Sequence, residues 1–350
     1  MDRRKSKRLA LAIVKWYAIN ARDLPWRRTK DPYCIAMSEI MLQQTQVKTV
    51  IPYYERWMRA LPGIADFARA RPERVLKLWE GLGYYRRVRL AQEAAKIVMD
   101  KHEGRFPEKM EDVLALPGVG RYTAGAICSI AFDQPAPILD GNVIRVLSRL
   151  LGIGGDTHLD SVRAKLWQAA EALVVSSGAP SRLNQGMMEL GALVCLPRQP
   201  QCAACPLRRN CFARRMNRVE DFPTPTRRAV VTQRRFIALV ASDGERLLVR
   251  RRLGSVVNAG LWEFPNVEVG VKAKDIRPLV VPFEIVARDP FFRVRHSITR
   301  YRILLEAYRA ELSSGADPNP AGATWKTPAQ LKNLPFTSAH RKVLHAASAF

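Results

Sequence analysis

The sequence predicts a mainly α-helical domain followed by a smaller α+β domain. From residue 6 to about residue 190, apolar side chains recur at helical spacing in stretches separated by proline and glycine. A proline-punctuated stretch at 221–228 ends this pattern, because proline cannot continue a helix. Beyond it the apolar side chains alternate with a period of two, which is typical of strands.

The helical part is expected to contain several amphipathic helices joined by short connections. Their predicted ranges are 74–79, 90–99, 110–116, 143–151 and 161–175. We assign residues 1–217 to this domain, with a cysteine-rich loop at 195–211, and residues 218–233 to a linker.

Residues 234–350 are assigned to the α+β domain. Two strand-like runs, 236–240 and 246–249, flank Asp243-Gly244, so we expect a β-hairpin there. Residues 302–308 form a further strand-like run.

The formal net charge is +25, and both predicted domains are basic. A positive field of this size attracts polyanions such as nucleic acids, although charge alone also fits a generally basic surface. No apolar stretch is long enough to span a bilayer, so we expect no membrane association. Lys15 interrupts the early apolar run and no cleavage site follows, so we expect no signal peptide and a cytoplasmic location.

Four cysteines near the end of the helical part point to a metal centre. Cys195, Cys202, Cys205 and Cys211 are separated by six, two and five residues. Disulfides are disfavoured because the expected compartment is reducing. Structural zinc sites usually have two short Cys-x-x-Cys-like pairs, whereas this chain has one, so an iron–sulfur cluster is favoured and zinc is the alternative.

Two glycines, Gly118 and Gly120, lie between two predicted helices. Glycine permits tight backbone geometry, and free amides at a helix start bind anions, so this turn can hold a phosphate. An ordinary helix–helix connection is the alternative.

Two carboxylates have the character of an acid and a charge stabiliser. Asp140 precedes a predicted helix, where it would act as an N-cap and the helix N-terminus would keep it ionised. Glu39 lies in an otherwise apolar and amide-rich stretch. If its side chain is buried, its pKa is raised and it can donate a proton; if it is solvated, its pKa is not raised. Such a pair suits cleavage of a bond to a sugar.

Several motifs together resemble those of one enzyme family. They are Leu24-Pro25-Trp26, 38–47, 81–85, 116–127, 138–143, 184–195 and the four cysteines. In this order the motifs resemble the helix-hairpin-helix, iron–sulfur DNA glycosylases, and within them the MutY family of adenine glycosylases. The resemblance implies a two-lobed helix-hairpin-helix domain with one [4Fe-4S] cluster on the four cysteines.

The resemblance also implies roles for individual residues. Glu39 would protonate an imidazole-ring nitrogen of a flipped-out adenine, and Asp140 would stabilise the oxocarbenium ion or a transient covalent sugar intermediate. Asn142 and Tyr122 would support Asp140 and the reacting centre. The remaining implied contacts are Gln44 and Tyr84 in the base stack, and Leu24, Trp26, Arg27 and Gln185 around the adenine. From the residues alone, Gln44 and Tyr84 equally fit a polar helix end and a half-buried aromatic.

The C-terminal domain resembles a Nudix-like module through the motif at 260–265. The resemblance implies recognition of 8-oxoguanine, and the absence of the Nudix catalytic box implies binding without hydrolysis. Ile298-Thr299-Arg300 stands where the family commonly has Phe-Ser-His. Thr299 can supply the hydroxyl, but Arg300 cannot accept a hydrogen bond, so the strength of lesion preference stays open.

The implied function is monofunctional removal of adenine mispaired with 8-oxoguanine or guanine in double-stranded DNA, by a monomer associated with a bacterial nucleoid. The alternative is an endonuclease III-like pyrimidine glycosylase with lyase activity, which would carry lysine in place of Tyr122. A non-catalytic DNA-binding relative would lack Glu39 or Asp140, and this chain has both.

Overall fold

A computed structural model describes residues 2–224, 230–254, 257–271, 273, 276 and 280–347. The chain divides into two compact units, residues 1–69 with 89–227 and residues 70–88 with 228–350. Residues 225–229 of the predicted linker lie outside the described residues. The predicted boundaries differ from these units: residues 70–88 group with the C-terminal part of the chain, and the predicted linker 218–233 is divided between the two units.

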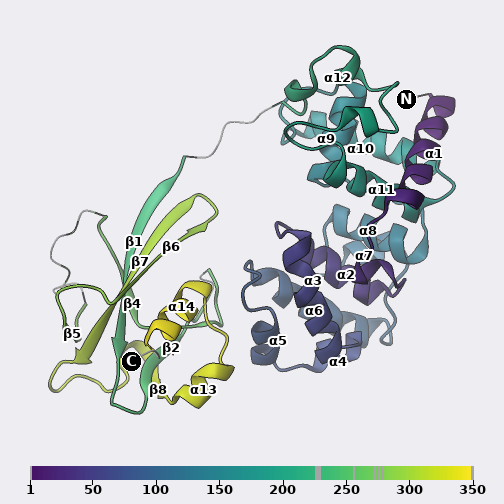
Figure 1. Cartoon of the computed structure of the whole chain (residues 1–350). Coiled ribbons are helices and arrows are strands. Elements are labelled where there is room, and N and C mark those ends of the chain that lie inside the picture. Colours follow the sequence, from purple (N-terminus) through teal and green to yellow (C-terminus); the bar gives the residue numbers. More distant parts are fainter. Residues whose placement is uncertain are drawn as a thin grey trace. The chain divides into compact units, whose positions relative to one another are not determined.

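The first unit consists of helices arranged in two lobes (Figure 1). Its helices are α1 (Arg3–Asn20), η1 (Pro25–Arg27), α2 (Pro32–Leu42), α3 (Val47–Ala60), α4 (Ile64–Arg69), most of α6 (Arg86–Lys101), α7 (Met110–Leu114), α8 (Arg121–Phe132), α9 (Gly141–Leu151), α10 (Asp160–Val175), α11 (Pro180–Leu193), η2 (Cys202–Ala204), α12 (Phe212–Arg215) and η3 (Val219–Asp221). The predicted helical character of this part and its two lobes are confirmed.

The core of each lobe is a separate group of apolar side chains. Helices α1, α9, α10 and α11 enclose one core, with Leu9, Leu147, Leu166 and Leu190 fully buried in it. Helices α2 and α7 enclose another core with part of α8. Helix α8 contributes to both cores, so it fixes the groove between the lobes.

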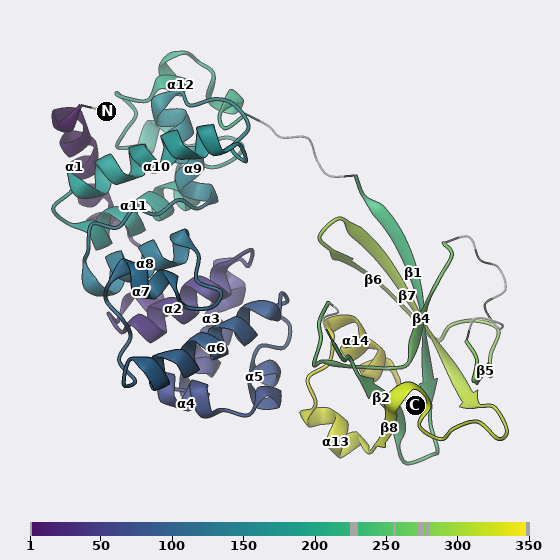
Figure 2. The same cartoon turned by 180° about the vertical axis from the view of Figure 1, so that it is seen from behind.

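The second unit contains α5 (Pro72–Leu78) and the predicted α+β fold, also seen from behind in Figure 2. Its other elements are β1 (Thr232–Ala241), β2 (Leu247–Arg251), β3 (Trp262–Glu263), β4 (Asn266–Val269), β5 (Phe283–Ile285), β6 (Phe292–Ile298), β7 (Tyr301–Leu312), η5 (Pro320–Gly322), β8 (Ala323–Lys326), α13 (Pro328–Asn333) and α14 (Ser338–Ala347). One sheet has the order β4-β1-β7-β5, with β6 also paired to β7, and the other has the order β3-β2-β8.

The predicted hairpin around Asp243-Gly244 forms only at its turn, where an antiparallel bridge joins Ser242 and Leu247. The turn itself forms, because the Asp243 carboxylate accepts a hydrogen bond from the Arg246 backbone N–H at 2.7 Å. However, β1 already has β4 on one edge and the parallel strand β7 on the other, so no edge remains for β2. Strand β2 pairs instead with β3 and β8 in the second sheet.

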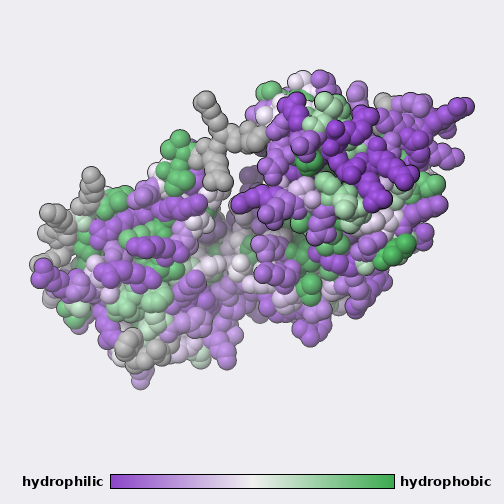
Figure 3. Space-filling view, turned by 45° about the horizontal axis from the view of Figure 1, so that its top comes forward, coloured by the Kyte–Doolittle hydropathy of each residue, from purple (hydrophilic) through white to green (hydrophobic). Residues whose placement is uncertain are grey.

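One face of the protein is largely hydrophilic (Figure 3). Figure 3 shows hydrophilic residues over most of the visible face, with hydrophobic residues in small patches. No described helix is both long and apolar enough to cross a bilayer.

Candidate active site and cysteine cluster

A cavity of about 520 Å³ lies in the first unit, between the two lobes. Its walls come from η1, α2, α8, the first turn of α9, and one face of α11. The predicted site residues in its lining are Leu24, Trp26, Arg27, Glu39, Gln44, Tyr122, Asp140, Asn142 and Gln185. Five predicted residues do not line it: Tyr84, Gly118, Gly120, Thr299 and Arg300.

Glu39 is a buried carboxyl group on α2, with 4% of its surface exposed. The Tyr122 hydroxyl donates a hydrogen bond to Glu39 Oε2 at 2.5 Å. Burial raises the pKa of Glu39 to about 7, although the bond from Tyr122 opposes the shift. Glu39 therefore has the burial and the proton affinity that a general acid needs near neutral pH.

Asp140 is the N-cap of α9, as predicted. Its carboxylate accepts hydrogen bonds from the Val143 backbone N–H at 2.7 Å and from the Asn142 side-chain amide at 3.0 Å. Burial raises the pKa of Asp140 above its usual value, and these hydrogen bonds together with the Arg145 charge only partly oppose that shift. The expected effect of the helix N-terminus is thus outweighed by desolvation.

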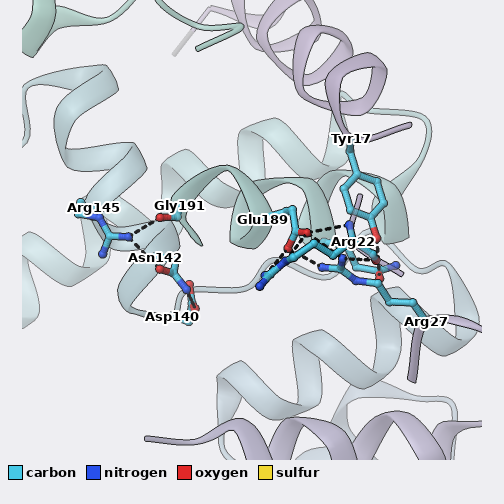
Figure 4. Close-up of polar contacts among 9 residues, drawn as sticks. Tyr17, Arg22, Arg27, Asp140, Asn142, Arg145, Glu189 and Gly191 are labelled. Carbon is cyan, nitrogen blue, oxygen red and sulfur yellow. Dashed lines mark hydrogen bonds and ion pairs between the residues drawn. The ribbon is translucent and has the colours of Figure 1, made fainter. Parts of the chain in front are cut away.

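Asn142 contacts Asp140 as predicted, whereas the Tyr122 hydroxyl contacts Glu39 instead. Asn142 is itself held by Arg145, whose guanidinium donates to Asn142 Oδ1 at 2.8 Å. The same guanidinium donates to the backbone carbonyl of Gly191 at 2.7 Å (Figure 4). It also donates to the backbone carbonyl of Cys195 at 2.7 Å. Arg145 therefore links Asp140, through Asn142, to the first residue of the cysteine loop.

Gly191 permits this close approach of α9 and α11. A Cβ atom at position 191 would lie 2.5 Å from the Asn142 Cβ, closer than carbon atoms pack. The glycine thus fixes Asn142 against α11.

An ionic network on α11 was not predicted. Glu189 is 1% exposed and accepts hydrogen bonds from Arg22 at 2.7 Å and from Arg27 at 2.9 Å (Figure 4). Burial by itself would raise the pKa of Glu189, but the two guanidinium groups lower it to about 2. The spacing offered a signal, because Glu189 lies four residues after Gln185 and so on the same helix face. The Tyr17 hydroxyl holds Gln185 at 2.9 Å.

The four predicted metal ligands, Cys195, Cys202, Cys205 and Cys211, line one cavity. Arg149 borders it: its guanidinium donates toward Cys195 Sγ at 3.4 Å, and its carbonyl lies 3.3 Å from Cys211 Sγ. Within the described part of the chain, no three His, Cys, Asp or Glu side chains are close enough to hold a single ion. Four sulfur donors around a shared cavity are the donor set of a [4Fe-4S] cluster, in which the thiolates bind different irons.

The turn between α7 and α8 carries the two predicted glycines. Gly118 has a φ of 75°, and a Cβ atom there would meet the Leu90 Cβ at 2.7 Å. Gly120 is the N-cap of α8 without a side-chain cap, and a Cβ atom there would meet nothing within 4 Å. The start of α8 is thus open to a bound anion.

Three predicted DNA-contacting residues have left-handed backbones. Gln44, Tyr84 and Thr299 have φ angles of 58°, 48° and 51°. Such angles are uncommon outside glycine, above all for β-branched threonine, and they concentrate at functional sites. Thr299 and Arg300 form the two-residue turn between β6 and β7, where both are exposed.

Comparison with known proteins identifies two domain families. The HhH-GPD superfamily base excision DNA repair protein family matches residues 37–172, and the NUDIX domain family matches residues 236–346. The adenine DNA glycosylase of Mus musculus is 34% identical over 95% of this chain and 76% of its own length. That of Homo sapiens is 33% identical over 95% of this chain and 72% of its own length.

Two solved structures resemble the helical part. A thermostable thymine-DNA glycosylase is 30% identical with a TM-score of 0.55, covering 61% of this chain and 100% of that protein. A trapped endonuclease III–DNA covalent intermediate shares the fold, with a TM-score of 0.52 at 22% identity over 62% of this chain and 99% of that one. Because the likeness to the mouse and human enzymes extends over nearly the whole chain, the protein belongs to the adenine DNA glycosylase family of HhH-GPD base excision DNA repair proteins.

Proposed function

We propose that this protein hydrolyses the N-glycosidic bond of adenine that is mispaired with 8-oxoguanine or guanine in double-stranded DNA. One observation carries the proposal: Glu39 and Asp140 line the same cavity. Glu39 is buried with a pKa of about 7, and Asp140 is the N-cap of α9. An acid and a charge stabiliser in one cavity are the two groups that departure of a base from a sugar requires.

Glu39 acts as the general acid in this proposal. The Tyr122 hydroxyl occupies Oε2, so the other carboxyl oxygen is available to carry the proton. That proton moves to a ring nitrogen of the flipped-out adenine, and the bonding electrons of the glycosidic bond move to the departing base. Proton transfer of this kind contributes about 10²–10⁴-fold to a rate.

Asp140 stabilises the positive charge that develops on the sugar, either as an ion pair or as a transient ester that water then cleaves. The amide of Asn142 and the backbone N–H of Val143 orient its two oxygens. Tyr122 carries no amine, so no Schiff base with the sugar forms at this position and the product keeps an intact strand.

The ionic network on α11 supports recognition of adenine. Glu189 stays ionised because Arg22 and Arg27 pair with it, so it can accept a hydrogen bond from an amino group. Leu24 and Trp26 add apolar surface to the same cavity, which suits a planar base.

Contacts outside the cavity serve the DNA duplex. The glycine turn before α8 binds a phosphate, while Gln44 and Tyr84 stack where the base has left. Thr299 and Arg300 read the opposite base. We propose that the protein acts on the duplex as a monomer.

Cys195, Cys202, Cys205 and Cys211 would hold one [4Fe-4S] cluster in this proposal. The cluster, when bound, supplies a covalent framework that orders the loop carrying it. That loop and the adjoining α12 present arginines suited to phosphate contact, namely Arg198, Arg208, Arg209, Arg214 and Arg215.

A single-turnover excision assay tests the proposal. Adenine opposite 8-oxoguanine, guanine and thymine is offered to the wild type, Glu39→Gln, Asp140→Asn and the exposed control Glu171→Gln. We expect the wild type and the control to excise adenine from the first two substrates and leave the strand intact until alkali treatment. Each active-site variant should lose at least about 10²-fold in rate while still binding DNA. Wild-type protein that releases no adenine, or that cuts the strand as it excises, would contradict the proposal.

A further inference from the structure

Residues 70–88 belong to the second unit although they interrupt the sequence of the first. They contain α5 and the following turn, which carries Tyr84. Under the proposed function, Tyr84 stacks on the bases and residues 228–350 read the opposite base. The same compact unit therefore contains both the stacking residue and the base-reading part of the chain.

Glu80 connects these two parts of the unit. Its Oε1 accepts hydrogen bonds from the Phe336 backbone N–H at 3.0 Å and from Arg341 Nε at 2.8 Å. Its Oε2 accepts a hydrogen bond from Lys77 at 2.7 Å. Only 15% of the side chain is exposed, so these charge-assisted bonds are shielded from water.

The two cations that hold Glu80 also hold the loop between α13 and α14. Lys77 Nζ donates to the Leu334 carbonyl at 3.2 Å, and the Arg341 guanidinium donates to the same carbonyl. The carboxylate thus fixes the position of α5 relative to this loop at several points. A buried network of this kind tolerates little displacement without loss of its bonds.

Tyr84 follows Glu80 by four residues through a turn that is closely braced. The Trp79 indole N–H donates to the Gly83 carbonyl at 3.0 Å, and the Gly81 backbone N–H donates to the Tyr85 hydroxyl at 3.2 Å. The Arg87 guanidinium lies 5.4 Å from the centre of the Tyr84 ring. Tyr84 as a residue is nevertheless 46% exposed, so it remains available for stacking.

We propose that Glu80 is a positioning residue through which the C-terminal α+β domain sets the Tyr84 turn, so that reading of the opposite base governs stacking beside the flipped adenine. This inference rests on the proposed function. A braced turn moves as one piece, so a shift of the α13–α14 loop is carried through Glu80 to Tyr84. Removal of Glu80 uncouples the two without touching the adenine cavity.

The test compares Glu80→Ala with Glu73→Gln in the full-length, cluster-containing protein. Glu73 lies on α5, seven residues before Glu80, and pairs with Arg251 at 3.2 Å, but that pair is exposed and contributes little. Single-turnover rates opposite 8-oxoguanine and guanine are measured, together with the fluorescence of 2-aminopurine placed next to the adenine. We expect Glu80→Ala to lower the 8-oxoguanine/guanine rate ratio about tenfold, an effect of the size found for residues in contact, and to change the fluorescence of 2-aminopurine. Glu73→Gln should change neither.

A double-mutant cycle with Arg341→Gln separates positioning from general destabilisation. If Glu80 acts through the C-terminal domain, Arg341→Gln gives the same loss of ratio and the double variant is no worse than either single variant. An unchanged 8-oxoguanine/guanine rate ratio in Glu80→Ala would overturn the inference. So would losses that add up in the double variant, affect the rates opposite 8-oxoguanine and guanine alike and accompany a lower thermal midpoint. Either result leaves adenine excision by the wild type intact, so it does not affect the proposed function.

Discussion

Two carboxyl groups of the same cavity are prepared for different tasks by their neighbours. Burial of Glu39 raises its pKa to about 7, although Tyr122 donates a hydrogen bond to it, so its proton is retained to about this pH. Asp140 is only partly buried, and a backbone N–H, an amide and the charge of Arg145 favour its ionised form. The difference in hydrogen-bond donors separates the acid from the charge stabiliser.

The rate of adenine excision is expected to depend on pH through Glu39. Above about pH 7 the protonated fraction of Glu39 falls, so the single-turnover rate should fall about tenfold per pH unit. At low pH, protonation of Asp140 should lower the rate as well, because its pKa is raised by burial. Rates measured between about pH 5 and about pH 9 give the profile. A rate that stays constant above pH 7 would show that Glu39 is not the acid.

The pKa of Glu39 also predicts a cost in stability. Because burial raises this pKa from 4.5 to about 7, the folded state binds a proton that the unfolded state releases between these two pH values. The free energy of unfolding therefore falls as pH rises through this window, by roughly 1.4 kcal/mol per unit of pKa shift.

Glu39→Gln should accordingly raise the thermal midpoint at about pH 8, and the gain should shrink as the pH approaches the ordinary carboxyl pKa. The exposed substitution Glu171→Gln should give no such pH-dependent gain. If Glu39→Gln changes the thermal midpoint equally at about pH 8 and near the ordinary carboxyl pKa, the raised pKa assigned to Glu39 is wrong.

Individual site residues differed in how well the sequence revealed them. Glu39 stands out because it is a carboxylate in an otherwise apolar and amide-rich stretch. Asp140 stands out because it directly precedes a predicted helix. Glu189 was missed because a carboxylate in a helix is ordinarily solvated, and its arginine partners lie more than 160 residues away in sequence. Its position on the helix face that carries Gln185 is a local signal that Glu189 faces the cavity, but its pairing with distant arginines has no local signature.

Among the elements, the turn between α7 and α8 contains two glycines that have different roles. Gly118 is needed for its left-handed backbone and for contact with Leu90, whereas Gly120 has space for a side chain. The first glycine therefore serves folding, and the second leaves room for a ligand.

Gly118→Ala is expected to lower the thermal midpoint, because the new methyl group collides with Leu90 and the backbone is strained. Gly120→Ala should leave the midpoint nearly unchanged but weaken DNA binding, because the methyl group lies where a phosphate would approach. Thermal unfolding and DNA titration at fixed salt check both. If Gly120→Ala binds DNA as tightly as the wild type, this turn does not bind a DNA phosphate.

The helices were largely predictable, whereas strand pairing was not. Amphipathic spacing locates α9 and α10 within a residue or two, because each helix buries one face locally. The turn at Asp243 was also found, but its flanking strands enter different sheets. Pairing is decided by which edges are already occupied, in this case by β4 and β7 from elsewhere in the chain.

For the whole molecule, catalysis and lesion preference are expected to be separable. All residues that line the adenine cavity fall between Arg22 and Ala192, ahead of the α+β fold. Deletion of residues 230–350 should therefore leave adenine excision detectable while the preference for 8-oxoguanine over guanine shrinks.

Thr299→Ala in the full-length chain provides the matched measurement, because it leaves the partners of residues 70–88 in place. It should lower the 8-oxoguanine/guanine rate ratio through loss of one hydroxyl hydrogen bond. An unchanged ratio in both proteins would indicate a general adenine-mismatch glycosylase.

The division into compact units was only partly predictable. The proline-rich stretch after Asp221 marks the end of the helical sequence, since local composition is sufficient to show it. The association of residues 70–88 with the C-terminal part depends on Glu80 meeting Arg341, and nothing near Glu80 in the sequence indicates such a distant partner.

The contacts of Glu80 also have a consequence for the timing of synthesis. Its partners Phe336 and Arg341 follow it by 256 and 261 residues. At about 5–20 residues per second, the ribosome would deliver them roughly ten to fifty seconds after Glu80 has been made. A nascent or prematurely released chain can thus contain every residue of the adenine cavity while the Tyr84 turn still lacks its support from the C-terminal part. Translation order would then make selective excision the last property that the growing chain acquires.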